Sequence, residues 1–106
     1  MSDDATILKV ERLPDGVRLV GDVDAASIDA LVAELDPLPG VNSDVIIDLA
    51  GVTFIDSSGL RTLVEAHQRA EQAGRRVLMA DPSVAVRRLF DISGLVPYLH
   101  IGTIEP

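Results

Sequence analysis

The clearest structural signal in this chain is the segment VIIDLAGVTFIDSSGL, which spans residues 45–60. It begins with Val45–Leu49, a short run that is β-branched and apolar on both faces. Such a run is typical of a strand that is covered on two sides or lies in the middle of a sheet. Residues 53–56 predict a short extended segment, and a helix is expected from about Ser57 to Ala73, with Gly74 ending it. The apolar stripe of this helix includes Leu60, Leu63, Val64 and Ala70.

A β-hairpin and a helix are predicted before this segment. Apolar residues are spaced along residues 5–12 and alternate again over residues 17–19, and Pro14-Asp15-Gly16 between them supplies turn residues. Asp24 is placed to cap a following helix, which Pro37–Gly40 prevents from continuing. The apolar residues of that helix fall at i, i+3, i+4 and i+7, namely Ile28, Leu31, Val32 and Leu35.

Strands and helices continue to alternate after residue 74. Arg76–Ala80 predicts a buried strand, and Asp81-Pro82 predicts a cap with proline at the first helical position. The helix that follows is expected to end at Gly94, and Tyr98–Ile104 predicts the last strand. This order predicts an α/β fold in which a hairpin opens a mixed central β-sheet, with α-helices packed on it in a single domain over residues 1–106.

Composition limits the class of protein. With 106 residues, 47% of them hydrophobic and none of them cysteine, the chain can fold around one core without a disulfide or a thiolate metal site, which favours the cytoplasm. No apolar run approaches the roughly 18 residues that a membrane-spanning helix needs, so no membrane association is expected. The formal net charge of −8 repels phosphate backbones, so nucleic acid is an unfavourable partner and another protein is favoured.

The residues with the most chemical potential stand at the predicted start of the second helix. Asp56, Ser57 and Ser58 occupy a place where unpaired backbone N–H groups and the positive end of the helix dipole favour an added anion. A serine there is suited to carry a phosphate. The alternative is purely structural, because aspartate and serine are also common helix caps.

Three blocks of sequence resemble the STAS domain of bacterial anti-sigma factor antagonists. They are Leu19–Asp24, Asp48–Leu60 and Arg88–Leu95, and the resemblance as a whole extends from Val17 to Leu99. It implies the STAS fold and a regulator that is not an enzyme and needs no cofactor. In this family, a partner anti-sigma factor that is also a serine kinase phosphorylates the first serine after the aspartate. That residue is Ser57 here.

The resemblance also implies a switch between partners. The unphosphorylated protein binds the anti-sigma factor and releases the sigma factor, phosphorylation reverses this, and a phosphatase restores the binding form. Asp22 and Asp24 match a family loop beside the phosphorylated serine, although both also fit a loop acid and a helix cap. Arg61 stands where the best-known members have glycine, and its guanidinium is a candidate to pair with phosphoserine. The implied partner-binding set is Asp22, Asp24, Asp56, Ser57, Ser58, Gly59 and Arg61, on a monomer or a weak dimer.

Three other functions compete with this interpretation. A receiver domain would also place an acid such as Asp48 near the end of a central strand, but it needs a lysine after a late strand, and the sole lysine is Lys9. A serine hydrolase needs a base near Ser57, whereas His67 lies about 15 Å along the same helix and is expected to pack in the core. A nucleotide-binding or signalling-complex module of the STAS type stays open, although no phosphate-binding glycine loop is present.

Overall fold

The computed structural model describes residues 7–35 and 44–103, in which five strands form one sheet. The strands follow one another across the sheet in the order β1-β2-β3-β4-β5; β1 and β2 are antiparallel, and all the other neighbours are parallel. Their bounds are β1 Lys9–Leu13, β2 Gly16–Val23, β3 Val45–Ile55, β4 Val77–Ala80 and β5 His100–Gly102. This is the predicted mixed sheet opened by a hairpin.

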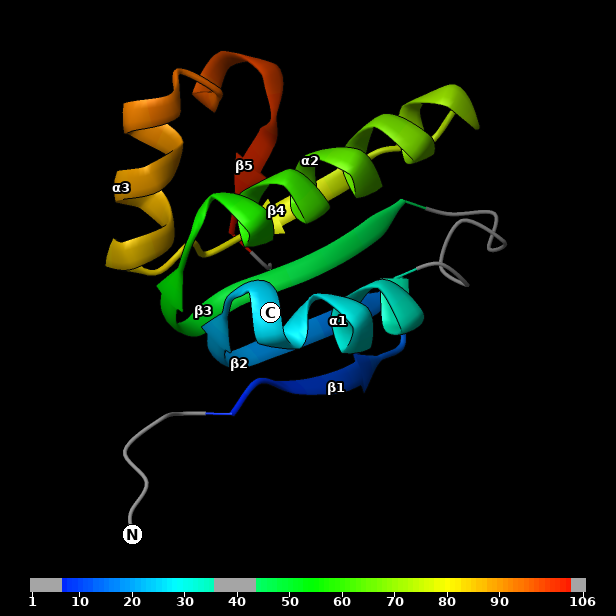
Figure 1. Ribbon diagram of the computed structural model, residues 1–106. Helices are drawn as coiled ribbons and strands as arrows, with labels where there is room; N and C mark the ends of the chain where they lie inside the picture. Colours follow the sequence, from blue (N-terminus) through cyan, green and yellow to red (C-terminus); the bar gives the residue numbers. More distant parts are fainter. Residues whose placement is uncertain (1–6, 36–43, 104–106) are drawn as a thin grey trace, which may run out of the picture.

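In the described part of the chain three α-helices pack on the sheet, and α1 and α2 lie side by side over it (Figure 1). A 3-10 turn, η1 (Ala25–Ser27), leads directly into α1 (Ile28–Leu35). The other helical elements among the described residues are α2 (Ser57–Gln72), α3 (Val84–Ser93) and a further 3-10 turn, η3 (Val96–Tyr98). Within the described ranges no helix has the length and apolar character needed to cross a membrane.

The core lies between the sheet and the three helices, and α3 contributes Val86 and Phe90 to it. On β2 and β3, alternate residues turn toward it, and Val17, Leu19 and Ile47 are completely buried there. From the helices, Leu31 and Leu63 pack against them in the same cluster. The predicted stripe of α2 is largely confirmed, because Leu60, Leu63 and Ala70 are buried and Val64 is partly buried against the cluster.

Three predicted boundaries are wrong. The central strand does not stop at Leu49 but runs without a break through residues 45–55, so the two extended segments are one strand. The cap of α3 is Ser83, whose hydroxyl accepts from the Val86 N–H at 3.3 Å, and Asp81-Pro82 lies before the helix. Tyr98 belongs to η3 and is 73% exposed, and β5 covers only residues 100–102.

The hairpin also differs in extent from its prediction. Its first strand begins at Lys9 rather than near residue 5, and Ile7 is exposed. Pro14 and Asp15 form the turn, while Gly16 already belongs to β2. A side chain at Gly16 would collide with the carbonyl group of Ile46, so this close approach of strands requires glycine. The expected helix stop at residues 37–40 lies outside the described residues.

Candidate functional site

The candidate site forms where β2 and β3 end side by side. These strands are parallel, so their carboxyl ends meet at one edge of the sheet, where Val23 pairs with Ile55. The next residues, Asp24 and Asp56, are the N-caps of η1 and α2. The Asp56 N–H donates to the Val23 carbonyl at 3.2 Å and ties the two strand ends together. Pairing of the strands therefore brings two helix starts to one place.

The start of α2 is held by a side-chain cap and a close backbone contact. Oδ1 of Asp56 accepts from the Gly59 N–H at 3.0 Å, which satisfies one of the unpaired donors at the helix end. Gly59 is buried, and a Cβ there would lie 2.6 Å from Cγ1 of Val23 and 2.7 Å from its carbonyl oxygen. These contacts press the first turn of α2 against the end of β2.

Both serines of this turn face solvent. Ser57 and Ser58 are exposed, and neither hydroxyl makes a hydrogen bond to a residue that the structure describes. The Thr62 hydroxyl donates to the Ser58 carbonyl at 3.1 Å, which engages the backbone and not the Ser58 side chain. Ser57 is therefore an accessible hydroxyl at the first position of a capped helix.

A groove of about 440 Å³ runs beside these serines, between η1 and α1 on one side and α2 on the other. Arg61 lies on its wall, one helical turn after Ser57, and makes no hydrogen bond or ion pair with the described residues. The groove is lined by Ala25, Ile28, Asp29, Val32, Ser57, Ser58, Arg61, Thr62 and Glu65. It has acidic, basic and apolar walls, which suits a surface of another protein.

The two aspartates of β2 and η1 have structural partners. Asp22 accepts a hydrogen bond from the Thr53 hydroxyl at 2.7 Å, and Asp24 accepts from the Ala26 N–H at 3.1 Å. The Asp24 N–H in turn donates to the Ser27 hydroxyl at 3.0 Å and closes a capping box. Both aspartates stand beside the end of β3, but neither lines the groove. Asp24 is thus a helix cap, which is the structural role that the sequence offered for it beside the family's loop.

Sequence reasoning missed the contribution of α1 and of the end of β3. Ile28 and Val32 were predicted as part of a core stripe, yet only Leu31 and Leu35 of that stripe are buried, and the other two line the groove. Phe54 is 49% exposed at the end of β3. The sequence carries no signal that separates the two roles, because four apolar residues at i, i+3, i+4 and i+7 are the ordinary pattern of a helix that packs on a core.

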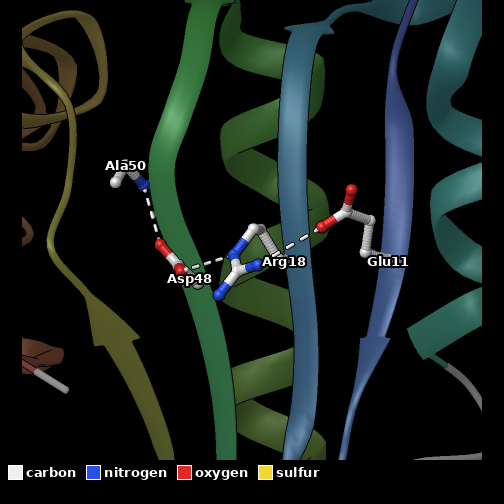
Figure 2. Close-up of polar contacts among 4 residues, drawn as sticks. All are labelled: Glu11, Arg18, Asp48 and Ala50. Atoms are coloured by element: carbon white, nitrogen blue, oxygen red, sulfur yellow. Dashed lines mark hydrogen bonds and ion pairs between the residues drawn. The ribbon is translucent and has the colours of Figure 1, made fainter. Parts of the chain in front are cut away.

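An ionic network on the face of the sheet opposite α2 supports the bend of β3 (Figure 2). Two register shifts between β2 and β3 mark bulges, and at the first of them Leu49 and Ala50 of β3 stand opposite the single residue Leu19 of β2. Oδ1 of buried Asp48 accepts from the Ala50 N–H, and its Oδ2 accepts from Nε of Arg18, both at 3.0 Å. Nη1 of Arg18 also reaches Glu11 at 3.4 Å.

Asp48 therefore has a structural role. Its hydrogen bond and its charge raise the pKa of Arg18 above the ordinary value. Within the described chain, Asp48 lies in the middle of β3 and not at the strand end where a receiver domain needs its acid. The network holds the bulge beyond which β3 continues to the candidate site.

The imidazoles lie elsewhere. His67 is buried in the second half of α2, and its ring is 5.6 Å from that of His100 on β5. Both rings are near Glu71, with N···O distances of 3.5 and 3.6 Å. His67 is on the same helix as Ser57 but ten residues further along, so the described residues place no imidazole base beside the serines.

Known proteins share both the sequence pattern and the fold. The family profile of the STAS domain matches residues 9–105. The anti-sigma F factor antagonist of Lysinibacillus sphaericus is 29% identical over 91 residues, which cover 84% of this chain and 78% of that protein. The anti-sigma-B factor antagonist of Bacillus subtilis is 32% identical over 86 residues, which cover 81% of this chain and 79% of that protein.

Solved structures agree in fold. The anti-sigma factor antagonist SpoIIAA in its unphosphorylated form superimposes with a TM-score of 0.73 at 24% identity, covering 92% of this chain and 89% of that one. Its phosphorylated form from Bacillus superimposes with a TM-score of 0.67 at 22% identity, covering 92% of each chain.

Proposed function

The chain belongs to the STAS domain family of anti-sigma factor antagonists, which are regulators and not enzymes, and we propose that it is the antagonist in a partner switch. In this proposal the unphosphorylated chain binds an anti-sigma factor that is also a serine kinase, and so releases a sigma factor. Phosphorylation of Ser57 reverses the binding, and a phosphatase restores it. The observation that carries the proposal is the accessible Ser57 hydroxyl at the capped start of α2, beside the groove.

Ser57 is a better phosphate acceptor than Ser27 on physical grounds. It is the first residue of α2, where backbone N–H groups and the helix dipole favour negative charge. Ser27, at the other helix start, has its hydroxyl engaged with Asp24. The two forms of SpoIIAA, which has the same fold, support phosphorylation as the reversible change.

Phosphate would weaken binding by charge and bulk rather than by unfolding. It adds about −1.5 to −2 charges to a site that already has Asp22, Asp24 and Asp56 around it. A partner surface that fits the groove would meet this charge at close range. A coupling of a few kcal/mol is enough, because each 1.4 kcal/mol changes the affinity about tenfold.

The site can be tested with a matched pair of variants. We expect Ser57→Ala to bind the anti-sigma factor as tightly as the unmodified chain, and Ser57→Asp to bind at least about tenfold more weakly, which is 1.4 kcal/mol. Calorimetry on both, with Ser58→Asp as the control for charge one residue away, measures this. Equal affinities for Ser57→Ala and Ser57→Asp would remove charge at Ser57 as the switch.

The modified residue can be identified directly. After incubation with ATP and the cognate kinase, mass spectrometry should locate the phosphate on Ser57, and Ser57→Ala should take up none. Phosphate found mainly on Ser58 would contradict the assignment.

Nucleotide binding is the second candidate, because the groove has a helix start and the guanidinium of Arg61 on its wall. Incubation with ATP in the absence of the kinase separates the two functions. Saturable ATP binding by the chain alone supports the second candidate, and phosphate incorporation only with the kinase supports the first.

A further inference from the structure

Two histidines and a glutamate converge far along α2 from Ser57. His67 and Glu71 are one helical turn apart on α2, and His100 reaches them from β5. Nε2 of His67 is 3.5 Å from Oε1 of Glu71, and Nε2 of His100 is 3.6 Å from Oε2 of the same carboxylate. One ligand atom from each of the three residues lies within 4.8 Å of the other two.

These separations fit a shared metal ion better than hydrogen bonds. An N–H···O hydrogen bond is typically 2.7–3.2 Å long, and both contacts exceed this. Around a tetrahedral Zn²⁺ with ligands at about 2.0–2.2 Å, neighbouring ligand atoms are about 3.3–3.6 Å apart. The two observed distances, one to each oxygen of the carboxylate, fall at the upper end of that range, and the three ligand atoms lie within 4.8 Å of one another, so binding would draw the side chains slightly together.

The surroundings of His67 leave Nε2, on the side of Glu71, as the ring nitrogen that is placed to bind an ion. The residue is 5% exposed, and its Nδ1 is buried without a hydrogen bond to the described residues. Its polar contact with Glu71 is made through Nε2. Glu71 is exposed and His100 partly so, which leaves a path for an ion from solvent.

We propose that His67, Glu71 and His100 bind one divalent transition metal ion, with Zn²⁺ as the best fit to two imidazoles and a carboxylate. Three protein ligands leave a fourth position for water. The ion would join the second half of α2 to β5, a strand of three residues at the edge of the sheet. The site is independent of Ser57, which is ten residues away at the start of α2.

The test uses the untagged chain after treatment with a chelator. Titration with ZnCl₂ in a calorimeter should show one ion per chain, and Zn²⁺ should raise the melting temperature, whereas Mg²⁺ should not. Co²⁺ in place of Zn²⁺ should give the visible absorption of a tetrahedral site. Failure of the unmodified chain to bind Zn²⁺, or binding without a defined stoichiometry, would overturn the proposal.

Variants locate the site. Glu71→Gln and His100→Ala change residues that are not buried, so both should fold, and each should lower the Zn²⁺ affinity at least tenfold. Glu65→Gln, on the same helix but six residues away, is the matched control and should bind as the unmodified chain does. Unchanged affinity in both Glu71→Gln and His100→Ala would assign the Zn²⁺ to another place and contradict the proposal. Ser57→Ala should also bind normally, so this result does not depend on the partner switch.

Discussion

The two helix starts at the ends of β2 and β3 use the same cap but differ in what they leave free. Asp24 and Asp56 each accept a hydrogen bond from a backbone N–H of the turn that follows. At η1 the serine of the first turn is bound back to Asp24, so its hydroxyl serves the cap. At α2 the hydroxyl of Ser57 faces solvent. The same kind of cap thus leaves the serine hydroxyl bound at η1 and leaves it accessible for phosphorylation at α2.

The largest effect is expected from breaking the close contact that only the second helix start has. A Cβ at Gly59 would lie 2.7 Å from the Val23 carbonyl oxygen, so Gly59→Ala should lower the free energy of unfolding by about 1–3 kcal/mol. In a helix without such a contact, replacing glycine by alanine stabilises the helix by up to about 1 kcal/mol. Urea denaturation measures the difference, with Ser58→Ala as the exposed control in the same turn. A gain in stability for Gly59→Ala would mean that the contact with Val23 relaxes easily.

A smaller effect should separate the two serines. Ser27→Ala removes the acceptor for the Asp24 N–H and is expected to lower the free energy of unfolding by about 1–2 kcal/mol. Ser57→Ala removes a hydroxyl that has no partner among the described residues. This change should alter the free energy of unfolding by less than about 0.5 kcal/mol. Thermal melts of both variants, run side by side, test this. Equal losses would show that the Ser57 hydroxyl also has a structural role.

The smallest effect concerns the phosphorylated chain. Arg61 follows Ser57 by one helical turn, so it should pair with the phosphate and stabilise the modified chain by about 0.2–0.5 kcal/mol at low salt. Arg61→Ala should therefore lower the melting temperature of the phosphorylated chain more than that of the unmodified chain. The difference should shrink as salt is added. If Arg61→Ala lowers the melting temperature equally in the phosphorylated and unmodified chains at every salt concentration, Arg61 does not pair with the phosphate.

Much of the fold could be predicted because its signals are local. The hairpin turn, the stripe of α2 and the cap at Asp56 each depend on residues within a few positions of one another. Boundaries were harder to predict. Ala50-Gly51 interrupts the apolar pattern, yet β3 continues through it, because Asp48 binds the Ala50 N–H and Arg18 from the neighbouring strand holds Asp48. Arg18 is 30 residues away in sequence, beyond the reach of any local pattern.

The start of α3 shows the same limit. Asp81-Pro82 is a good local cap signal, but the Ser83 N–H donates to the Leu49 carbonyl at 3.3 Å, and this contact with β3 places Ser83 at the helix start. Tyr98 likewise has strand propensity, but it follows Pro97 in the first turn of a 3-10 helix that begins at Val96. Tertiary contacts and proline geometry outweighed propensity in both places.

The sequence alone was sufficient to place Asp56, Ser57 and Gly59 at a helix start, because a cap is completed within three residues of the chain. It could not show which serine hydroxyl is free, that Ile28 and Val32 face a groove, or that His67 and His100 meet at Glu71. Those facts depend on how strands pair and helices pack. Packing brings together residues such as His67 and His100, which are 33 positions apart and leave no periodic trace in the sequence.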